Sequence, residues 1–180
     1  CIDGSDNLHF AAIHMFYLDE PTYDYDLSIL YLQREATTET WAAPEYSECP
    51  QVAEDVTEFA FCCNEAGDVL VGYFVYPSPE YWYRICYAYR DASTGTWTHD
   101  YLAPYQVSGD CIAIAVDDAG LFHVLVELDD YEEEFESNFW IFRYMTFDGS
   151  TWTTIHDHDA WNGAAIGVQR TIRIYVTGPN

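Results

Sequence analysis

Three Thr-Trp pairs divide the chain into units of similar length. The pairs are Thr40-Trp41, Thr96-Trp97 and Thr151-Trp152, spaced by 56 and then 55 residues. Each pair follows a polar turn, at residues 35–39, 91–95 and 148–150. An aromatic-rich run of strand composition precedes each turn, at residues 27–33, 81–89 and 138–147. Self-similarity at such a period is the signature of a repeat architecture, so the chain is expected to fold as stacked copies of one unit.

A second repeated pattern lies upstream of the aromatic runs. Large and small residues alternate in Phe-Ala-Phe-Cys-Cys at 59–63, Ile-Ala-Ile-Ala-Val at 112–116 and Ala-Ala-Ile-Gly-Val at 164–168. Successive side chains of a strand point to opposite faces, so one face of each run carries only Ala, Cys or Gly. Small side chains fit where several strands converge and the space between them tapers.

Each unit is therefore expected to form four strands, with a long acidic loop between the second and third. The chain is predicted to be all-β, with four-stranded blades of the β-propeller type and no long helix. The predicted repeats are 1–55, 56–108 and 109–161, with a partial fourth at 162–180. In the first repeat only Cys1-Ile2 is left for the innermost strand, and residues 42–55 are expected to form a connection with a short helical turn.

About three and a half blades make an incomplete ring, since propellers typically close with about four to eight. Two interpretations remain open. The chain is a piece of a larger propeller, or copies of it assemble into a ring or a longer array.

The best-defined copy resembles a known group of proteins. Residues 112–124, followed by residues 142–152, are similar to secreted bacterial propeller repeats of the sialidase-like, Asp-box (BNR-type) group. Residues 148–152 look like an Asp-box shortened by one residue, and residues 91–97 like a lengthened one. The first copy, at 35–41, lacks both the Asp and the Gly. In that group the box is a structural hairpin on the blade rim, so the resemblance implies architecture and says little about chemistry.

The charge of the chain narrows its range of partners. Asp and Glu number 31 against six Arg and no Lys, for a formal net charge of −25. Nucleic acid and anionic membrane surfaces attract positive proteins, so neither is expected as a partner. No run of residues has the length and apolarity of a transmembrane segment.

The cysteines favour an oxidising compartment, and the protein is expected to be extracellular or at the cell surface. The disulfide candidates are Cys1, Cys49, Cys62, Cys63, Cys86 and Cys111. A bond between the adjacent Cys62 and Cys63 would be strained, which favours separate partners or buried thiols. Because the sequence starts on Cys1, a lipid anchor at that residue is one interpretation, and a cleaved or trimmed chain is the other.

Two polar segments are candidates for metal binding. Asp129, Asp130, Glu132 and Glu133 would offer Ca²⁺ the hard oxygen ligands that it requires, although a solvated acidic loop explains the same residues. The segment 156–159 (His-Asp-His-Asp) could bind a transition metal or form a plain polar loop. His9 and His123 recur at comparable places in two copies, which favours hydrogen bonding within a blade over catalysis.

Aromatic residues supply the candidate binding surface. Tyr76, Tyr81, Trp82 and Tyr83 cluster around two prolines in an expected loop, where they could contact a sugar or a protein partner. Most other Tyr and Trp residues are expected to pack between blades.

These features favour a non-catalytic extracellular propeller module that acts in self-assembly or protein interaction. A carbohydrate-binding, lectin-like propeller is the alternative, and a fragment of a divergent glycoside hydrolase or lyase is a further one. The chain has no Gly-rich phosphate loop, no Gly-x-Ser-x-Gly and no His-Glu-x-x-His, and its six Arg form no recognisable triad. No cofactor is expected apart from Ca²⁺.

Overall fold

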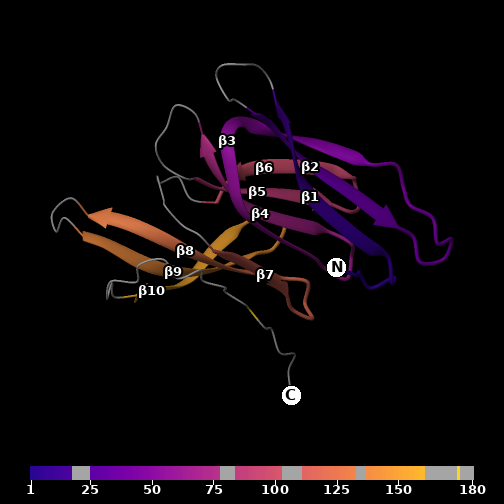
Figure 1. Ribbon diagram of the computed structural model, residues 1–180. Coiled ribbons are helices and arrows are strands. Elements are labelled where there is room, and N and C mark those ends of the chain that lie inside the picture. The colour runs from indigo at the N-terminus through magenta and orange to yellow at the C-terminus, as the bar shows by residue number, and fades with distance from the viewer. Residues whose placement is uncertain (18–24, 78–83, 103–110, 133–136, 161–173, 175–180) are drawn as a thin grey trace.

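The computed structural model describes residues 1–17, 25–77, 84–102, 111–132, 137–160 and 174. These residues form antiparallel strands in two sheets, one of six strands and one of four (Figure 1). The described part of the chain contains no helix that is long and apolar enough to cross a membrane. The strands are β1 (Leu8–Tyr17), β2 (Tyr25–Arg34), β3 (Glu45–Cys63), β4 (Val69–Pro77), β5 (Arg84–Asp91), β6 (Thr96–Tyr101), β7 (Ile112–Val116), β8 (Phe122–Glu132), β9 (Ser137–Phe147) and β10 (Trp152–Ala160).

The six-stranded sheet consists of two blades that share one strand. The first part of β3 pairs with β2 between Glu45 and Ala53, and the second part pairs with β4 between Ala53 and Cys63. Figure 1 shows β3 bending strongly between these two parts. The first blade is therefore β1, β2 and the start of β3, and the second blade is the end of β3 with β4, β5 and β6. The third blade is the separate sheet β7 to β10, whose strands pair in chain order.

The predicted four-strand unit is thus confirmed, and the fold is all-β with propeller-type blades in an incomplete ring. In the first blade the innermost strand is reduced to one antiparallel bridge between Ile2 and Leu8. Residues 161–173 and 175–180, which hold almost all of the predicted fourth repeat, lie outside the described residues.

Residues 156–159, expected as a polar loop or metal site, lie in β10, and Tyr76, expected in a loop, lies in β4. Two further sequence-based boundaries were wrong. Residues 42–55 do not form a connection with a helical turn, because β3 begins at Glu45 and runs through this segment. The acidic segment of the third unit is also not wholly a loop, since β8 continues to Glu132 and pairs there with Ser137 of β9. In both places backbone pairing with a long neighbouring strand overrides a local composition that is poor in strand formers.

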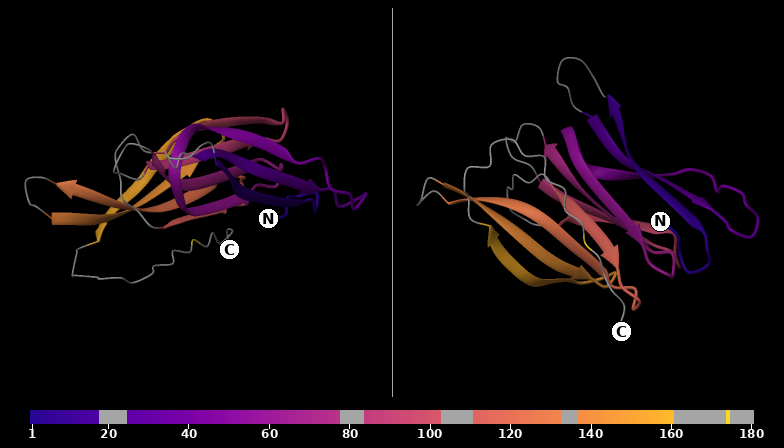
Figure 2. Two further views of the ribbon diagram at one scale, coloured as in Figure 1. Left: turned by 45° about the horizontal axis from the view of Figure 1, so that its top comes forward. Right: turned by 60° about the horizontal axis from the view of Figure 1, so that its bottom comes forward.

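The second blade is buried on both faces. Val69, Val71 and Val75 of β4 point toward the first blade, in a cluster that includes Leu27 and Ile29. Leu70 and Phe74 of the same strand point toward the third blade, in a cluster that includes Phe122 and Val124. Burying a side chain of this kind contributes about 1.5–3 kcal/mol. The right-hand view of Figure 2 shows the resulting order of layers, from the indigo strands through magenta to orange.

The innermost strands approach most closely, and small residues make room for them. Ile112 and Ile114 of β7 point toward the second blade, where Gly72 of β4 faces them. A Cβ atom at Gly72 would overlap Cδ1 of Ile112 and would lie 3.3 Å from Cδ1 of Ile114. Ala60 of β3 packs on the same side, next to Gly72 in the strand pairing. In the run 59–63 the small Ala60 lies at this close approach, as predicted. In the run 112–116 the large Ile112 and Ile114 face it instead, and Ala113 and Ala115 lie on the opposite face. The third run lies outside the described residues.

Equivalent positions form the contacts at both blade interfaces. Trp97 of the second blade meets the edge of Tyr31 in the first, with ring centroids 5.7 Å apart. Trp152 of the third blade meets the edge of Tyr87 in the second in the same way, at 5.1 Å. The residue paired with each Trp contacts the same Tyr as the Trp does. Cζ of Arg90, which pairs with Trp97, lies 4.8 Å from the centroid of the Tyr31 ring. The ring centroid of Phe147, which pairs with Trp152, lies 5.6 Å from that of Tyr87.

The interface between the first and second blades has polar contacts at the positions where the interface between the second and third blades has aromatic ones. Arg90 donates two hydrogen bonds to Glu45, of 2.9 and 2.8 Å, and the Trp97 indole donates a third, of 3.2 Å. Ser47 Oγ and His99 Nε2 lie 2.6 Å apart across the same interface. Burial works to raise the pKa of Glu45, but the hydrogen bonds from Arg90 and Trp97 outweigh it and hold that pKa below its ordinary value.

Replacing Gly72 with Val is expected to lower the free energy of unfolding by about 1–3 kcal/mol, because the new side chain overlaps Ile112. Urea denaturation measures the change. The double variant Gly72→Val/Ile112→Ala provides the control, because it removes the clashing atoms. We expect the double variant to lose less than the sum of the two single changes, and additive losses would contradict the close approach.

Glu45→Gln is expected to reduce stability at pH 7 by about 1 kcal/mol, a value discounted because the Glu45 side chain is 37% exposed. A carboxyl with a lowered folded-state pKa stabilises the protein above its unfolded value and loses this contribution as the pH falls through the folded value. The difference between wild type and variant should therefore hold from pH 8 to 5 and shrink below the ordinary value of 4.5. Thermal melts across this range measure it, and a constant difference down to pH 2.5 would contradict the assignment.

Candidate functional site

A pocket opens between the second and third blades, at the end where the tight turns lie. Its volume is about 530 Å³, within the range of small-molecule sites. Three segments of chain meet there: the turn between β3 and β4, the end of β5 with the turn that follows it, and the turn between β9 and β10. The lining residues are Ala66, Asp68, Tyr89, Asp91, Ala92, Ser93, Asp148, Gly149 and Ser150.

Two of the carboxylates hold the turns in which they lie. Asp91 Oδ1 accepts hydrogen bonds of 2.8 and 2.6 Å from the backbone and hydroxyl of Ser93. Asp148 Oδ1 accepts from the backbone and hydroxyl of Ser150, both at 2.9 Å, and from the Thr151 backbone at 2.8 Å. The hydroxyl and backbone of Ser93 lower the pKa of Asp91, and the backbones of Ser150 and Thr151 lower that of Asp148. Both side chains are therefore anionic at neutral pH.

Asp68 connects the two pocket segments that belong to the second blade. Its Oδ1 accepts a 2.8 Å hydrogen bond from the Ala92 backbone, and its Oδ2 accepts one of 2.9 Å from the Asn64 side chain. Asp68 thereby fixes the turn after β3 against the turn after β5.

Tyr89 provides the aromatic wall of the pocket. Its ring meets Phe122 and Phe147 edge to face, with centroids 6.3 and 5.2 Å away, which fixes its orientation. Burial, together with the charge of Asp68 and a hydrogen bond to it, raises the pKa of Tyr89 to about 12. The hydroxyl is therefore neutral and able to donate. A Cβ atom on Gly149 would lie 2.8 Å from that hydroxyl, so glycine at this position keeps the pocket open.

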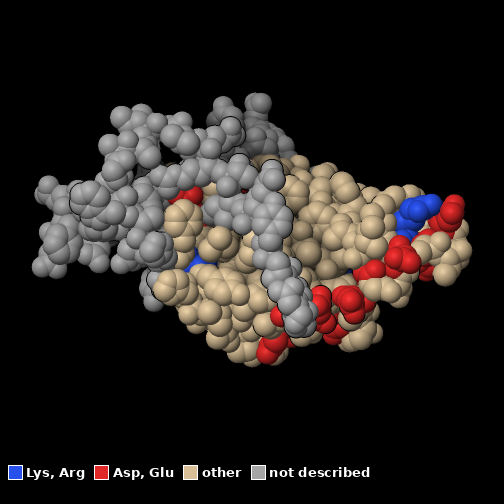
Figure 3. Space-filling model, turned by 90° about the horizontal axis from the view of Figure 1, so that it is seen from below, with Lys and Arg blue, Asp and Glu red and all other residues tan. Residues whose placement is uncertain are grey.

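The lining combines hydrogen-bond acceptors with a flat ring. The hydroxyl hydrogens of Ser93, Ser150 and Tyr89 are donated to the three carboxylates of the lining. A carboxylate accepts hydrogen bonds through about four lone-pair sites, so each can serve a ligand as well as its own turn. None of the residues that line the pocket is Arg, Lys or His. Figure 3 shows acidic side chains gathered along one edge of the face drawn there, with few basic ones. This arrangement suits a neutral, hydroxyl-rich ligand and repels an anion.

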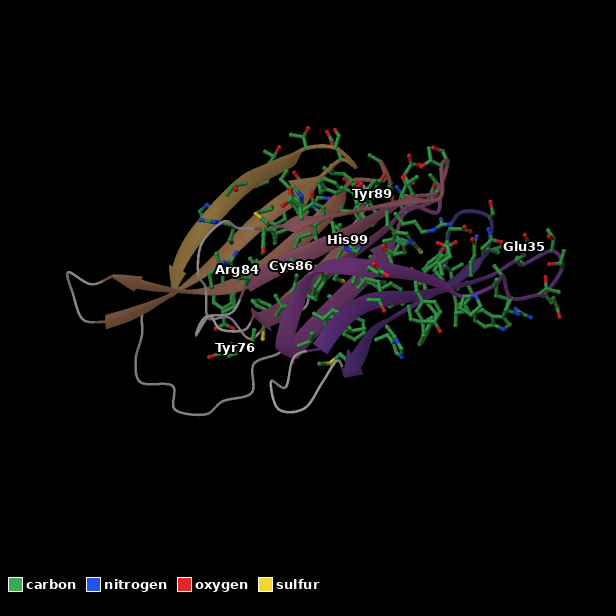
Figure 4. The ribbon with its side chains drawn as sticks, turned by 90° about the horizontal axis from the view of Figure 1, so that it is seen from above. Glu35, Tyr76, Arg84, Cys86, Tyr89 and His99 are labelled. Carbon is green, nitrogen blue, oxygen red and sulfur yellow. The ribbon has the colours of Figure 1, made fainter. Side chains whose placement is uncertain are left out.

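The aromatic residues predicted from the sequence do not form this pocket. Tyr76 lies near the end of β4, at the opposite end of the blade from Tyr89 (Figure 4). Arg84, at the start of β5, also lies at that opposite end. Tyr81, Trp82 and Tyr83 lie outside the described residues, so their predicted role in binding stays a prediction.

The calcium prediction also remains untested. The backbones of Asp129, Asp130 and Glu132 belong to β8, and Glu133 lies outside the described residues. Within the described ranges no three His, Cys, Asp or Glu side chains form a group that could hold a metal ion. His156 is an exposed residue of β10, just after an irregularity in its pairing with β9.

None of the six cysteines forms a disulfide in this structure, so none of the pairings that the sequence allowed is present in it. Cys49, Cys63, Cys86 and Cys111 are buried, and Cys1 and Cys62 are half-buried. Burial raises the pKa of the Cys63 thiol to about 11 and that of Cys86 to about 12. A thiol with so high a pKa is a poor nucleophile at neutral pH.

The two repeated histidines form the internal hydrogen bonds expected of them. Nδ1 of His9 lies 2.6 Å from the Tyr31 hydroxyl oxygen, and its Nε2 lies 3.0 Å from Asp3 Oδ2. His123 makes the same pair of contacts, 2.5 Å to the Tyr144 hydroxyl and 3.1 Å to Asp117. Each group ties the first turn of its blade to the third strand, and Leu70 replaces the histidine in the second blade.

Most of the pocket was not predicted from the sequence. Asp91 and Asp148 were visible as turn residues of the repeats but were interpreted as architecture alone. Tyr89 belonged to an aromatic run in which many positions pack between blades. Asp68 carried no motif, although its position four residues after Asn64 in a polar turn could have indicated a role in fixing that turn.

Comparisons with known proteins show a distant structural likeness. No family model matches the chain, and no curated protein matches it. Among solved structures, the chain is similar to a fucose lectin from Kordia zhangzhouensis in complex with methyl-fucoside, with a TM-score of 0.44 and 14% sequence identity. The match covers 86% of this chain and 94% of the lectin chain. The resemblance to the sialidase-like Asp-box group stays a prediction from the turn residues.

Proposed function

We infer that this protein is a non-catalytic carbohydrate-binding module whose ligand is a neutral glycan held in the pocket between the second and third blades. The observation that carries the proposal is the composition of the pocket: three carboxylates, two serine hydroxyls and one aromatic ring, without any cationic side chain. Sugars present hydroxyl groups that donate to carboxylate and hydroxyl oxygens, and an apolar face that packs on an aromatic ring.

The size and stiffness of the pocket support the same function. A volume of about 530 Å³ accommodates one sugar ring or a short oligosaccharide. The lining lies on tight turns that are fixed by hydrogen bonds within them, so little ordering is required when a ligand binds. The negative net charge of −25 disfavours sialylated, sulfated and phosphorylated glycans.

Self-assembly is the second candidate function. A separate surface favours it, namely the exposed apolar face of the first blade, which includes Phe10 and Trp41. The two functions are compatible, because the pocket lies between the second and third blades and that surface points away from both.

A glycan array containing neutral and acidic glycans tests the proposal, with a matched pair of variants. Ala66→Trp places a large side chain at the pocket, whereas Ala119→Trp makes the same change at the equivalent turn of the third blade, among residues that do not line it. We expect wild type and Ala119→Trp to bind neutral glycans and Ala66→Trp to lose at least about tenfold in affinity. The proposal fails if no neutral glycan binds, or if both tryptophan variants bind like wild type.

Binding is expected to be independent of pH between about 5 and 9. Asp91 and Asp148 have pKa values below the ordinary 3.8, so they remain ionised over this range, and Tyr89, with a pKa of about 12, remains neutral. Isothermal titration with the best neutral glycan from the array measures this dependence. An inflection near pH 6.5 would contradict the site, because it would implicate a histidine, and none lines the pocket.

A further inference from the structure

One face of the first blade remains exposed although its counterparts in the other blades are buried. This face points away from the second blade. On β1 it carries Leu8 and Phe10, since Ala11 and Ile13 pack toward the second blade. Residues paired directly across antiparallel strands share a face, which adds Ile2 opposite Leu8, Leu32 opposite Phe10, and Trp41 opposite Arg34. We call it the leading face.

The exposed apolar residues of the described chain concentrate on the leading face. Phe10 is 47% exposed, Trp41 51% and Ile2 62%, and Leu8 and Tyr46 are exposed as well. Tyr46 belongs to this face because it pairs with Leu30 of β2, and it contacts His14 at a ring distance of 5.7 Å. A contiguous apolar patch of this kind marks an interaction surface.

The equivalent residues of the second and third blades are buried by the preceding blade. Val69 and Val71 correspond to Leu8 and Phe10 in the second blade, and Phe122 and Val124 correspond to them in the third. All four are at most 1% exposed. At two interfaces within the chain, this face of one blade is therefore covered by the opposite face of the preceding blade.

The face of a blade that covers the next blade has a tyrosine at its centre. This residue is Tyr31 in the first blade, paired with Ala11, and Tyr87 in the second, paired with Gly72. Each Tyr receives a Trp and the residue paired with that Trp: Trp97 and Arg90 on Tyr31, and Trp152 and Phe147 on Tyr87. The leading face presents the same combination, with Trp41 paired to Arg34.

The third blade repeats the covering face. Tyr144 of β9 pairs with Leu125 of β8, the position of Ala11 and Gly72 in the earlier blades. The Tyr144 ring stacks on His123 at 5.9 Å, and both side chains keep part of their surface exposed. We call the face that carries Tyr144 and Leu125 the trailing face.

We propose that the leading face of one molecule docks on the trailing face of a second copy of this chain, so that molecules associate head to tail. Trp41 and Arg34 of one copy would then meet Tyr144 of the other, as Trp97 and Arg90 meet Tyr31 within the chain. The occupant is a second copy because the chain itself carries the matching Tyr, while the part of the chain that the structure describes leaves Trp41 51% exposed. A head-to-tail contact uses two different surfaces, so it produces a closed ring or an open array rather than a symmetric pair.

The proposal predicts a mass that rises with concentration. Sedimentation velocity of the wild-type chain, whose mass is 20.7 kDa, should show species larger than one chain. Phe10→Ser/Trp41→Ser removes the two large side chains from the leading face and is expected to raise the apparent Kd at least about tenfold. Phe59→Ser is the control, since Phe59 is a similarly exposed apolar residue (42%) of the second blade. It should associate like wild type.

Mixing two defective variants tests the head-to-tail direction. Phe10→Ser/Trp41→Ser keeps an intact trailing face, and Leu125→Glu keeps an intact leading face. Each should remain a single chain alone, and a 1:1 mixture should form a pair of chains and nothing larger. Circular dichroism verifies that each variant is folded, and Tyr144→Ala replaces Leu125→Glu if the latter is not.

The proposal is overturned if wild type stays a single chain up to about 1 mM, a concentration at which even weak specific contacts form. It is also overturned if Phe59→Ser weakens association as much as the leading-face variant does, or if the mixture does not restore a pair. Loss of glycan binding in Ala66→Trp leaves these outcomes unchanged, because the pocket lies between other faces.

Discussion

The stacking of one sheet on the next is the interaction on which the whole molecule depends. Val71 and Leu70 are neighbours in β4, yet they are buried in different clusters on opposite sides of the same blade. A sheet that is apolar on both faces is not stable in water by itself, so the second blade requires both neighbours. The close approach at Gly72 and the alternation of large and small residues in β7 follow from the same requirement.

The pocket and the interfaces are made from different parts of each repeat. Strand interiors supply the apolar layers, whereas the turns at one end supply Asp68, Asp91 and Asp148. Stacking fixes the distance between neighbouring turns, and hydrogen bonds within each turn orient its carboxylate. The rim can therefore vary in polar residues without disturbing the core, which is the usual relation between a rigid scaffold and its functional loops.

The strands were largely predictable from the sequence, and the site was not. The Thr-Trp pairs and the alternation in residues 112–116 indicate local strand geometry, which a single chain segment determines. Residues 42–55 were misread because Pro44 and Pro50 are poor strand formers, but Pro50 lies where the pairing of β3 with β2 shifts register, a position that tolerates proline. The pocket combines turns from two blades, and no local pattern states that Asp68 and Asp148 line the same pocket.

The first two blades are mechanically coupled because they share β3. This strand is hydrogen-bonded to β2 on one side of Ala53 and to β4 on the other, so a force that pulls the blades apart acts directly on these hydrogen bonds. Separation has to unzip one of these ladders. Among the described strands none is shared between the second and third blades, so under load the molecule should yield there first.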